Sequence, residues 1–188
     1  MKRRSFLRGL ATVAPSVALE SVIAKHAAAE AGAPPCASDV QVVGAGEGRD
    51  GHPHSLGFSS ISFKVTTCQT GGGLFVIEHT HLVPGGPPLH LHWNQEEYFY
   101  VMEGTVAFQV GDRRVELNPG ESVLAPRRIP HTFSSVKPSS RLLIAFTPAG
   151  KMEEYFRESE QHRALAADPE FMSRYEMKMV GPSPFWKA

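Results

Sequence analysis

Several features that would point directly to a function class are missing from this sequence. Its 188 residues include only two cysteines, too few for the disulfide framework of a small secreted scaffold. The 19 basic and 19 acidic residues balance, so no basic surplus suggests nucleic-acid binding. No run of the mature chain is apolar and long enough to span a membrane. The length suits one domain and is too short for two sizeable cores.

The N-terminal segment shows, in order, the features of an export signal. Residues 2–8 are charged and contain two adjacent arginines, residues 9–24 are weakly apolar, and residues 27–29 are all alanine. This order resembles a bacterial twin-arginine signal peptide, the alternative being an ordinary amphipathic helix. We therefore expect residues 1–29 to be cleaved and the protein to be periplasmic or secreted.

Both cysteines, Cys36 and Cys68, follow this segment. In an oxidising compartment they could pair and tie the N-terminal region to the next strand. The alternative is two unpaired thiols. The sequence does not choose, because it gives no Cα separation.

The middle of the chain consists of short segments with alternating apolar residues, separated by turns rich in Gly, Pro and Asn. The segments expected to be strands are 59–67, 74–83, 89–92, 97–102, 105–110, 114–117, 122–125, 131–136 and 142–146. No helical crossover lies between them, which excludes a parallel α/β sheet. The pattern predicts an all-β domain, a double-stranded β-barrel or jelly roll, over residues 30–149.

The tail after Gly150 has a different composition. Residues 151–167 are polar and favour a helix, and Asp168 followed by Pro169 is typical of an N-cap with proline in the first turn. We expect a short C-terminal helical appendage, residues 150–188, packed on the barrel.

The most informative motif places His90 and His92 two residues apart on a predicted strand. Alternate side chains of a strand share a face, so both imidazoles can reach one ion. Glu97 has the opposite parity and can join them only if a turn through residues 93–96 resets the register. A His-x-His pair alone is weak support for a metal site, and its surroundings decide.

Those surroundings resemble the two motifs of the cupin superfamily, over roughly residues 57–148. The first motif is His-x-His, then Glu97 and, after six intervening residues, Gly104. The second runs from Gly120 through Pro126 to His131, with Arg128 where the family has glycine and Ser135 where it has asparagine. The tail also resembles that of small bacterial cupins related to quercetin dioxygenases. The resemblance implies a divalent metal ion held by His90, His92, Glu97 and His131, and it leaves a homodimer open.

Other candidate ligands have simpler explanations. His79-x-His81 lies on a predicted strand; His79 could orient a ligand, but an exposed strand histidine is the favoured interpretation. His52-x-His54 lies in a loop without a suitably spaced carboxylate. Two further polar residues, Glu96 and His162, are expected at the surface.

The ligand set leads to three hypotheses about function. The first is a quercetinase-like dioxygenase for an aromatic or enolisable small molecule, with Glu97 as a general base. The second is an oxygen-independent isomerase, decarboxylase or lyase, and the third is a non-catalytic metal- or ligand-binding protein. The pocket walls are expected to be Phe99, Val101, Phe108 and Phe133. Folding around the metal before export favours iron or manganese, with nickel, zinc and copper as alternatives.

Overall fold

The computed structural model describes residues 36 and 40–186, so the predicted signal peptide lies outside the described residues. Residues 40–186 belong to one compact unit. Within the described part of the chain, no helix has the length and apolar character needed to cross a membrane. Neither Cys36 nor Cys68 is a free thiol, which contradicts the alternative of two unpaired thiols.

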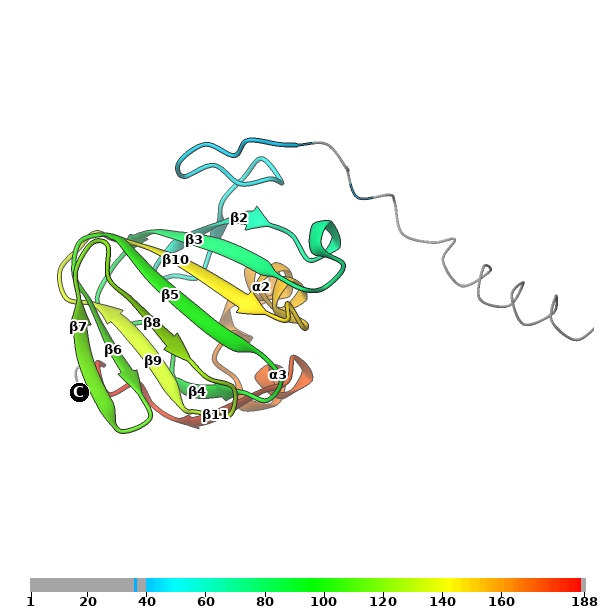
Figure 1. Ribbon diagram of the computed structural model, residues 1–188. Helices are drawn as coiled ribbons and strands as arrows, with labels where there is room; N and C mark the ends of the chain where they lie inside the picture. The colour runs from blue at the N-terminus through cyan, green and yellow to red at the C-terminus, as the bar shows by residue number, and fades with distance from the viewer. Residues whose placement is uncertain (1–35, 37–39, 187–188) are drawn as a thin grey trace, which may run out of the picture. The chain divides into compact units, whose positions relative to one another are not determined.

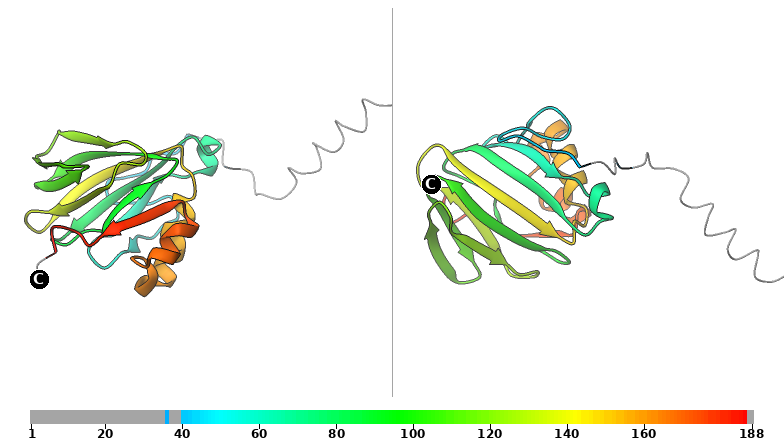
Figure 2. Two further views of the ribbon diagram at one scale, coloured as in Figure 1. Left: turned by 90° about the horizontal axis from the view of Figure 1, so that it is seen from below. Right: turned by 45° about the horizontal axis from the view of Figure 1, so that its top comes forward.

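Two antiparallel sheets make up most of this unit (Figures 1 and 2). The first has the strand order β1-β2-β3-β10-β5-β8 and the second β11-β4-β9-β6-β7. The strands are β1 (His54–Ser55), β2 (Ser60–Val65), β3 (Phe75–Leu82), β4 (Leu89–His92), β5 (Glu96–Glu103), β6 (Val106–Val110), β7 (Arg113–Leu117), β8 (Ser122–Ala125), β9 (His131–Ser135), β10 (Ser140–Thr147) and β11 (Met177–Gly181). The predicted all-β jelly roll is confirmed.

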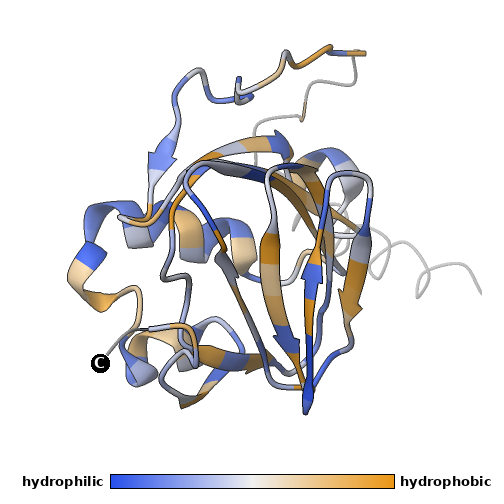
Figure 3. Ribbon diagram, turned by 90° about the vertical axis from the view of Figure 1, so that its left-hand side faces the viewer, coloured by the Kyte–Doolittle hydropathy of each residue, from blue (hydrophilic) through white to orange (hydrophobic). Residues whose placement is uncertain are grey.

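The core lies between the sheets and is built by alternation along the strands, visible as orange and blue stretches in Figure 3. On β10, Leu142, Ile144 and Phe146 are buried while the residues between them are less so. Each large side chain that is fully buried contributes about 1.5–3 kcal/mol through the hydrophobic effect. The alternation therefore fixes which side of each strand faces the interior.

The chain after β10 forms short helices that lie together beside the sheets (Figure 2). These are α2 (Met152–Gln161), the 3-10 helix η2 (Arg163–Leu165) and α3 (Pro169–Arg174); a further 3-10 turn, η1 (Cys68–Thr70), follows β2. Helix α2 buries Met152 and Phe156. The Asp168 carboxylate accepts a hydrogen bond of 2.8 Å from the Phe171 amide, which confirms the predicted N-cap.

The sequence suggested a helical tail. The tail also forms a strand, β11, after its helices. This strand pairs with β4, with Met177 opposite His92 and Met179 opposite His90. A free edge at β4 would leave backbone N–H and C=O groups without partners, and β11 supplies them. The tail thus completes the second sheet directly beside the predicted metal ligands.

Candidate metal centre

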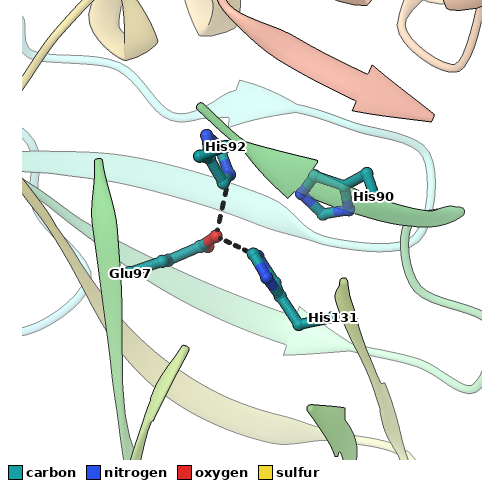
Figure 4. Close-up of side chains that lie close together, drawn as sticks. All are labelled: His90, His92, Glu97 and His131. Carbon is teal, nitrogen blue, oxygen red and sulfur yellow. Dashed lines mark hydrogen bonds and ion pairs between the residues drawn. The ribbon is translucent and has the colours of Figure 1, made fainter. Parts of the chain in front are cut away.

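The four predicted ligands come from three strands and meet at one point (Figure 4). His90 and His92 lie on β4, Glu97 on β5 and His131 on β9. Their potential ligand atoms all lie within 4.8 Å of one another. The side chains are almost fully buried, His90 being the most accessible at 7%. Residues 41 positions apart in the chain thus share one small volume.

Strand geometry explains this convergence. Strand β4 ends at His92 and β5 begins at Glu96, so the intervening turn resets the register as the sequence required. On β5, Glu97 then shares the inner face with Phe99 and Val101. His131 joins from β9, where it pairs with His90 across the second sheet.

Two of the imidazoles are oriented by the same backbone device. Nδ1 of His90 donates to the Pro88 carbonyl and Nδ1 of His131 donates to the Ile129 carbonyl, both over 2.9 Å. In each case the carbonyl belongs to the residue two positions earlier in the chain. With the proton fixed on Nδ1, Nε2 is left to bind a metal ion, and such partners typically hold ligating histidines in place.

Glu97 lies between two of the imidazoles. Its Oε2 atom is 2.8 Å from Nε2 of His131 and 3.0 Å from Nε2 of His92. Burial would raise the pKa of this carboxyl, but the interactions with His131 and His92 outweigh burial and hold the pKa well below its usual range. Glu97 therefore stays ionised.

Burial has the opposite consequence for the histidines. It lowers the pKa of His90 to about 3, helped by the neighbouring His131 and His92. The pKa of His92 is also lowered by burial, although the Glu97 carboxylate opposes this. Neutral imidazoles and an ionised carboxylate are the protonation states in which these groups bind a divalent cation.

Two observations test whether a metal ion fits. Both ring nitrogens of His131 face oxygen acceptors, which requires either an imidazolium or a cation beside Nε2. His92 is 1% exposed, and among the described residues neither of its ring nitrogens makes a well-aligned hydrogen bond, although Nε2 has an ionic contact with Glu97 at 3.0 Å. A buried polar group without such a bond costs about 1–3 kcal/mol, a cost that a bound cation would remove from Nε2. The cluster can therefore hold a divalent ion, whose identity the ligands do not decide.

The departures from the family pattern leave the cluster intact. Arg128 has a φ of 66°, the left-handed conformation that glycine adopts most easily. Its amide donates a 2.7 Å hydrogen bond to the His92 carbonyl, so the turn against the ligand strand is kept. The Ser135 side chain makes its hydrogen bonds elsewhere. Its hydroxyl forms a 2.7 Å hydrogen bond with the Ser140 hydroxyl.

A cavity of about 220 Å³ opens onto the cluster. His90, His92 and Glu97 line it, and most of its other walls are apolar. Of the four predicted wall residues, Phe133 alone lines it. The other three, Phe99, Val101 and Phe108, belong to the packed core. Strand residues advance about 3.3 Å each, so Phe99 and Val101 lie progressively further from Glu97 along β5.

The walls that the sequence analysis missed come largely from the C-terminal tail. They include Met152, Tyr155 and Phe156 of α2, Met172 of α3, Met177 of β11 and Trp186. Methionine and aromatic residues on one side of the predicted helix were the available signal. What could not be read from the sequence was the surface that this side covers.

The alternative histidine pairs also differ from expectation. His79 is 2% exposed and lines the cavity, so its interpretation as an exposed strand histidine was wrong. It continues the inward row of Phe75 and Ile77, a signal that alternation did offer. His54 is buried as well, its Nδ1 and Nε2 contacting Glu160 at 2.5 Å and Asp50 at 2.6 Å respectively.

The remaining residues expected at the surface differ in their surroundings. Glu96 is not simply solvated, because it forms a two-pronged ion pair with Arg127 at 2.5 and 2.6 Å. His81 and His162 are exposed.

Comparison with known proteins supports the resemblance seen in the two motifs. Residues 78–145 match the family model of the cupin domain. The match covers 68 of the 188 residues. The matched segment holds all four residues of the cluster, so the cupin resemblance of the two motifs is supported over the part of the chain that matters for the site.

The individual relatives are distant. The "Probable oxidoreductase virH" of Hypocrea virens is 30% identical over 83 residues, and the match spans only 37% of that protein and 39% of this chain. An RmlC-like cupin from Shewanella frigidimarina superposes with a TM-score of 0.51 and 16% identity, covering 62% of this chain and 98% of that one. KdgF from Halomonas sp. gives a TM-score of 0.47 and 17% identity, over 53% and 87% of the two chains. At this identity the Shewanella structure supports the fold and no particular reaction.

Proposed function

We propose that this cupin is a metal-dependent dioxygenase acting on a small aromatic or otherwise enolisable molecule. The observation that carries the proposal is the cluster of three histidines and one glutamate at the wall of a mostly apolar cavity. Mostly apolar cavities of this kind suit poorly solvated ligands, with a few polar groups fixing the orientation. The similarity to a probable oxidoreductase is in keeping with redox chemistry.

Each part of the cavity has a role in this proposal. His90, His92, Glu97 and His131 would hold the ion, which when bound supplies Lewis acidity toward a substrate enolate or catecholate and toward dioxygen. The apolar walls from β10, α2 and β11 exclude water and bind the body of the substrate. Glu97 is ionised in the metal-free protein, and in this proposal its carboxylate holds the ion and, when it shifts off the ion, accepts a proton from a substrate hydroxyl.

The test is oxygen uptake by the metal-loaded protein with flavonols and smaller enolisable substrates. Glu97→Gln should lower the rate by at least about 100-fold, because the amide is a neutral and weaker ligand and cannot accept a proton. His162→Gln, an exposed position on the tail, is the matched control. Uptake that continues at the wild-type rate in Glu97→Gln would contradict the proposal.

Two other outcomes would support a different function. Turnover of the same substrates under strict anaerobiosis would indicate an isomerase, decarboxylase or lyase. Tight metal binding without conversion of any substrate would indicate a storage or binding protein.

We further propose that the protein acquires its metal in the cytoplasm and is exported folded. The basis is the order of features in residues 1–29, with adjacent Arg3 and Arg4. Replacing both arginines with lysine should retain the protein in the cytoplasmic fraction of a twin-arginine-competent bacterial host. Unchanged export of that variant would contradict this part of the proposal.

A further inference from the structure

One polar side chain of the cavity has no part in the metal cluster. His79 on β3 is 2% exposed and lines the same cavity as His90, His92 and Glu97. Aromatic rings hold its plane, with Phe58 stacked at 6.3 Å and Phe133 edge-on at 5.6 Å between ring centroids. An imidazole so constrained offers its polar atoms in fixed directions.

The first of these atoms is engaged by the protein. Nδ1 of His79 lies 2.8 Å from the Ser59 hydroxyl, which is itself buried at 6% exposure. Ser59 immediately precedes β2, and β2 pairs with β3 at Ile61 opposite His79, so the backbone sets this contact. The serine thus fixes the ring orientation of His79, and its hydroxyl can pair with either tautomer.

The second atom is not engaged. Among residues 40–186, no protein group hydrogen-bonds to Nε2 of His79. Burial lowers the pKa of His79 to about 4, although the negative charge of Glu97 opposes this, so the ring is neutral near pH 7. A neutral imidazole carries one donor and one acceptor, and Ser59 uses one of them. The other faces an otherwise largely apolar cavity.

We propose that Nε2 of His79 hydrogen-bonds a second polar group of the substrate, and that Ser59 is the residue that positions it. This inference rests on the proposed function of the cavity and narrows its substrate class. The substrate is a small, mostly apolar molecule with two separated polar groups. One is an enolate or catecholate for the four-residue cluster, and the other is a hydroxyl or carbonyl for His79.

Specificity of this kind arises because a site built to hydrogen-bond a polar group rejects the analogue that lacks it. A ligand without the second group would leave Nε2 desolvated and unpaired. The loss of one hydrogen bond of this type corresponds to about tenfold in affinity. The cavity should therefore discriminate between two probes of the same shape that differ only in that group.

The experiment measures binding and does not depend on turnover. The probes are two catechols substituted para to one hydroxyl, one with a hydroxymethyl group and the other with its ethyl isostere. A hydroxymethyl group can donate or accept, so it suits either tautomer of His79. Dissociation constants are measured by calorimetry on protein loaded with Zn²⁺, in wild type and in His79→Phe, His79→Gln and Ser59→Ala. His81→Gln is the matched control, an exposed histidine two residues further along the same strand.

Wild type and His81→Gln should favour hydroxymethylcatechol over ethylcatechol by about tenfold more than His79→Phe does. His79→Gln should restore part of the preference, because the amide retains a donor and an acceptor. Ser59→Ala should weaken it several-fold with unchanged metal content. The imidazole nitrogen resonance of His79 Nε2, observed in isotope-labelled protein, should shift with hydroxymethylcatechol and not with ethylcatechol.

The proposal is overturned if His79→Phe keeps the wild-type preference, if the Nε2 resonance does not respond, or if neither probe binds the zinc-loaded protein. Should His79→Phe fail to fold, Ser59→Ala and the resonance decide the matter. The binding measurements on zinc-loaded protein do not require oxygen consumption. A negative oxygen-uptake assay would therefore not change how the dissociation constants are interpreted. The two proposals can therefore fail separately.

Discussion

The interior between the two sheets has two ends that share strands but differ in chemistry. On β5, Glu97 belongs to the metal cluster, whereas Val101, four residues on, is part of the packed core. On β9, His131 belongs to the cluster, and Phe133, two residues later, lines the cavity but also packs against Phe108 with ring centroids 6.1 Å apart. Both ends use the same inward-facing positions. Depth along a strand, and not the face alone, therefore decides whether a position serves the site or the core.

A substitution at the aromatic end should lower stability without changing the metal affinity of the cluster. Phe108→Ala removes a fully buried ring and should destabilise the protein by about 3–5 kcal/mol, because the cavity that remains cannot collapse completely. Metal affinity of the folded variant should be unchanged. Chemical denaturation and a metal titration measure the two effects.

Leu124→Ala, at a side chain that is 49% exposed, is the control and should cost well under half as much. A fall in metal affinity equal to the fall in stability in Phe108→Ala would show that the two ends are not independent.

The polar end should be sensitive to acid in the metal-free protein. In the folded state the pKa of His79 is lowered from 6.5 to about 4 and that of His90 from 6.5 to about 3. From pH 6.5 down to the folded pKa of each histidine, the unfolded chain therefore binds more protons than the folded protein. Stability is therefore lost as the pH falls below 6.5, by about 1.4 kcal/mol per pH unit for each histidine. His79→Phe should reduce this slope by about one histidine's share.

The pH dependence is measured by urea denaturation at a series of pH values, with His81→Gln as the reference. A slope that is the same in His79→Phe and wild type would mean that His79 does not resist protonation in the folded state.

The smallest expected effect concerns the turn that holds the ligand strand. Arg128 has a positive φ of 66°, which costs a non-glycine residue about 1 kcal/mol. Arg128→Gly should therefore raise stability by up to about that amount, less the greater flexibility of glycine in the unfolded chain. Arg128→Ala, which removes the same side chain but keeps the strain, should not. Thermal unfolding distinguishes them, and equal melting temperatures for the two variants would contradict a strained turn.

Much of this comparison was predictable from the sequence. Alternation assigned the inner faces, and the resemblance of the two motifs to those of the cupin superfamily implied that His131 lies together with His90. Depth was not predictable, which is why Phe99, Val101 and Phe108 were expected at the pocket wall. Alternation is a local property with a period of two, whereas depth depends on how strands are staggered across a sheet.

The tail shows the same limit. Its helices and the cap at Asp168 could be read locally from capping and composition. Strand β11 could not, since a short run such as Met177–Gly181 becomes a strand only because the edge of β4 is available. Likewise, the contact of His54 with Glu160 joins residues 106 positions apart, and no local pattern signals it.

The most direct test of the account is the metal content and affinity of the purified chain after replacement of single ligands. Wild type and His81→Ala should each bind one divalent ion per chain, measured by elemental analysis and competitive chelator titration. His90→Ala and His131→Ala should lose at least about 100-fold in affinity, because each removes one of four ligands from a buried site. Unchanged stoichiometry and affinity in these two variants would contradict the assignment of the cluster as a metal centre.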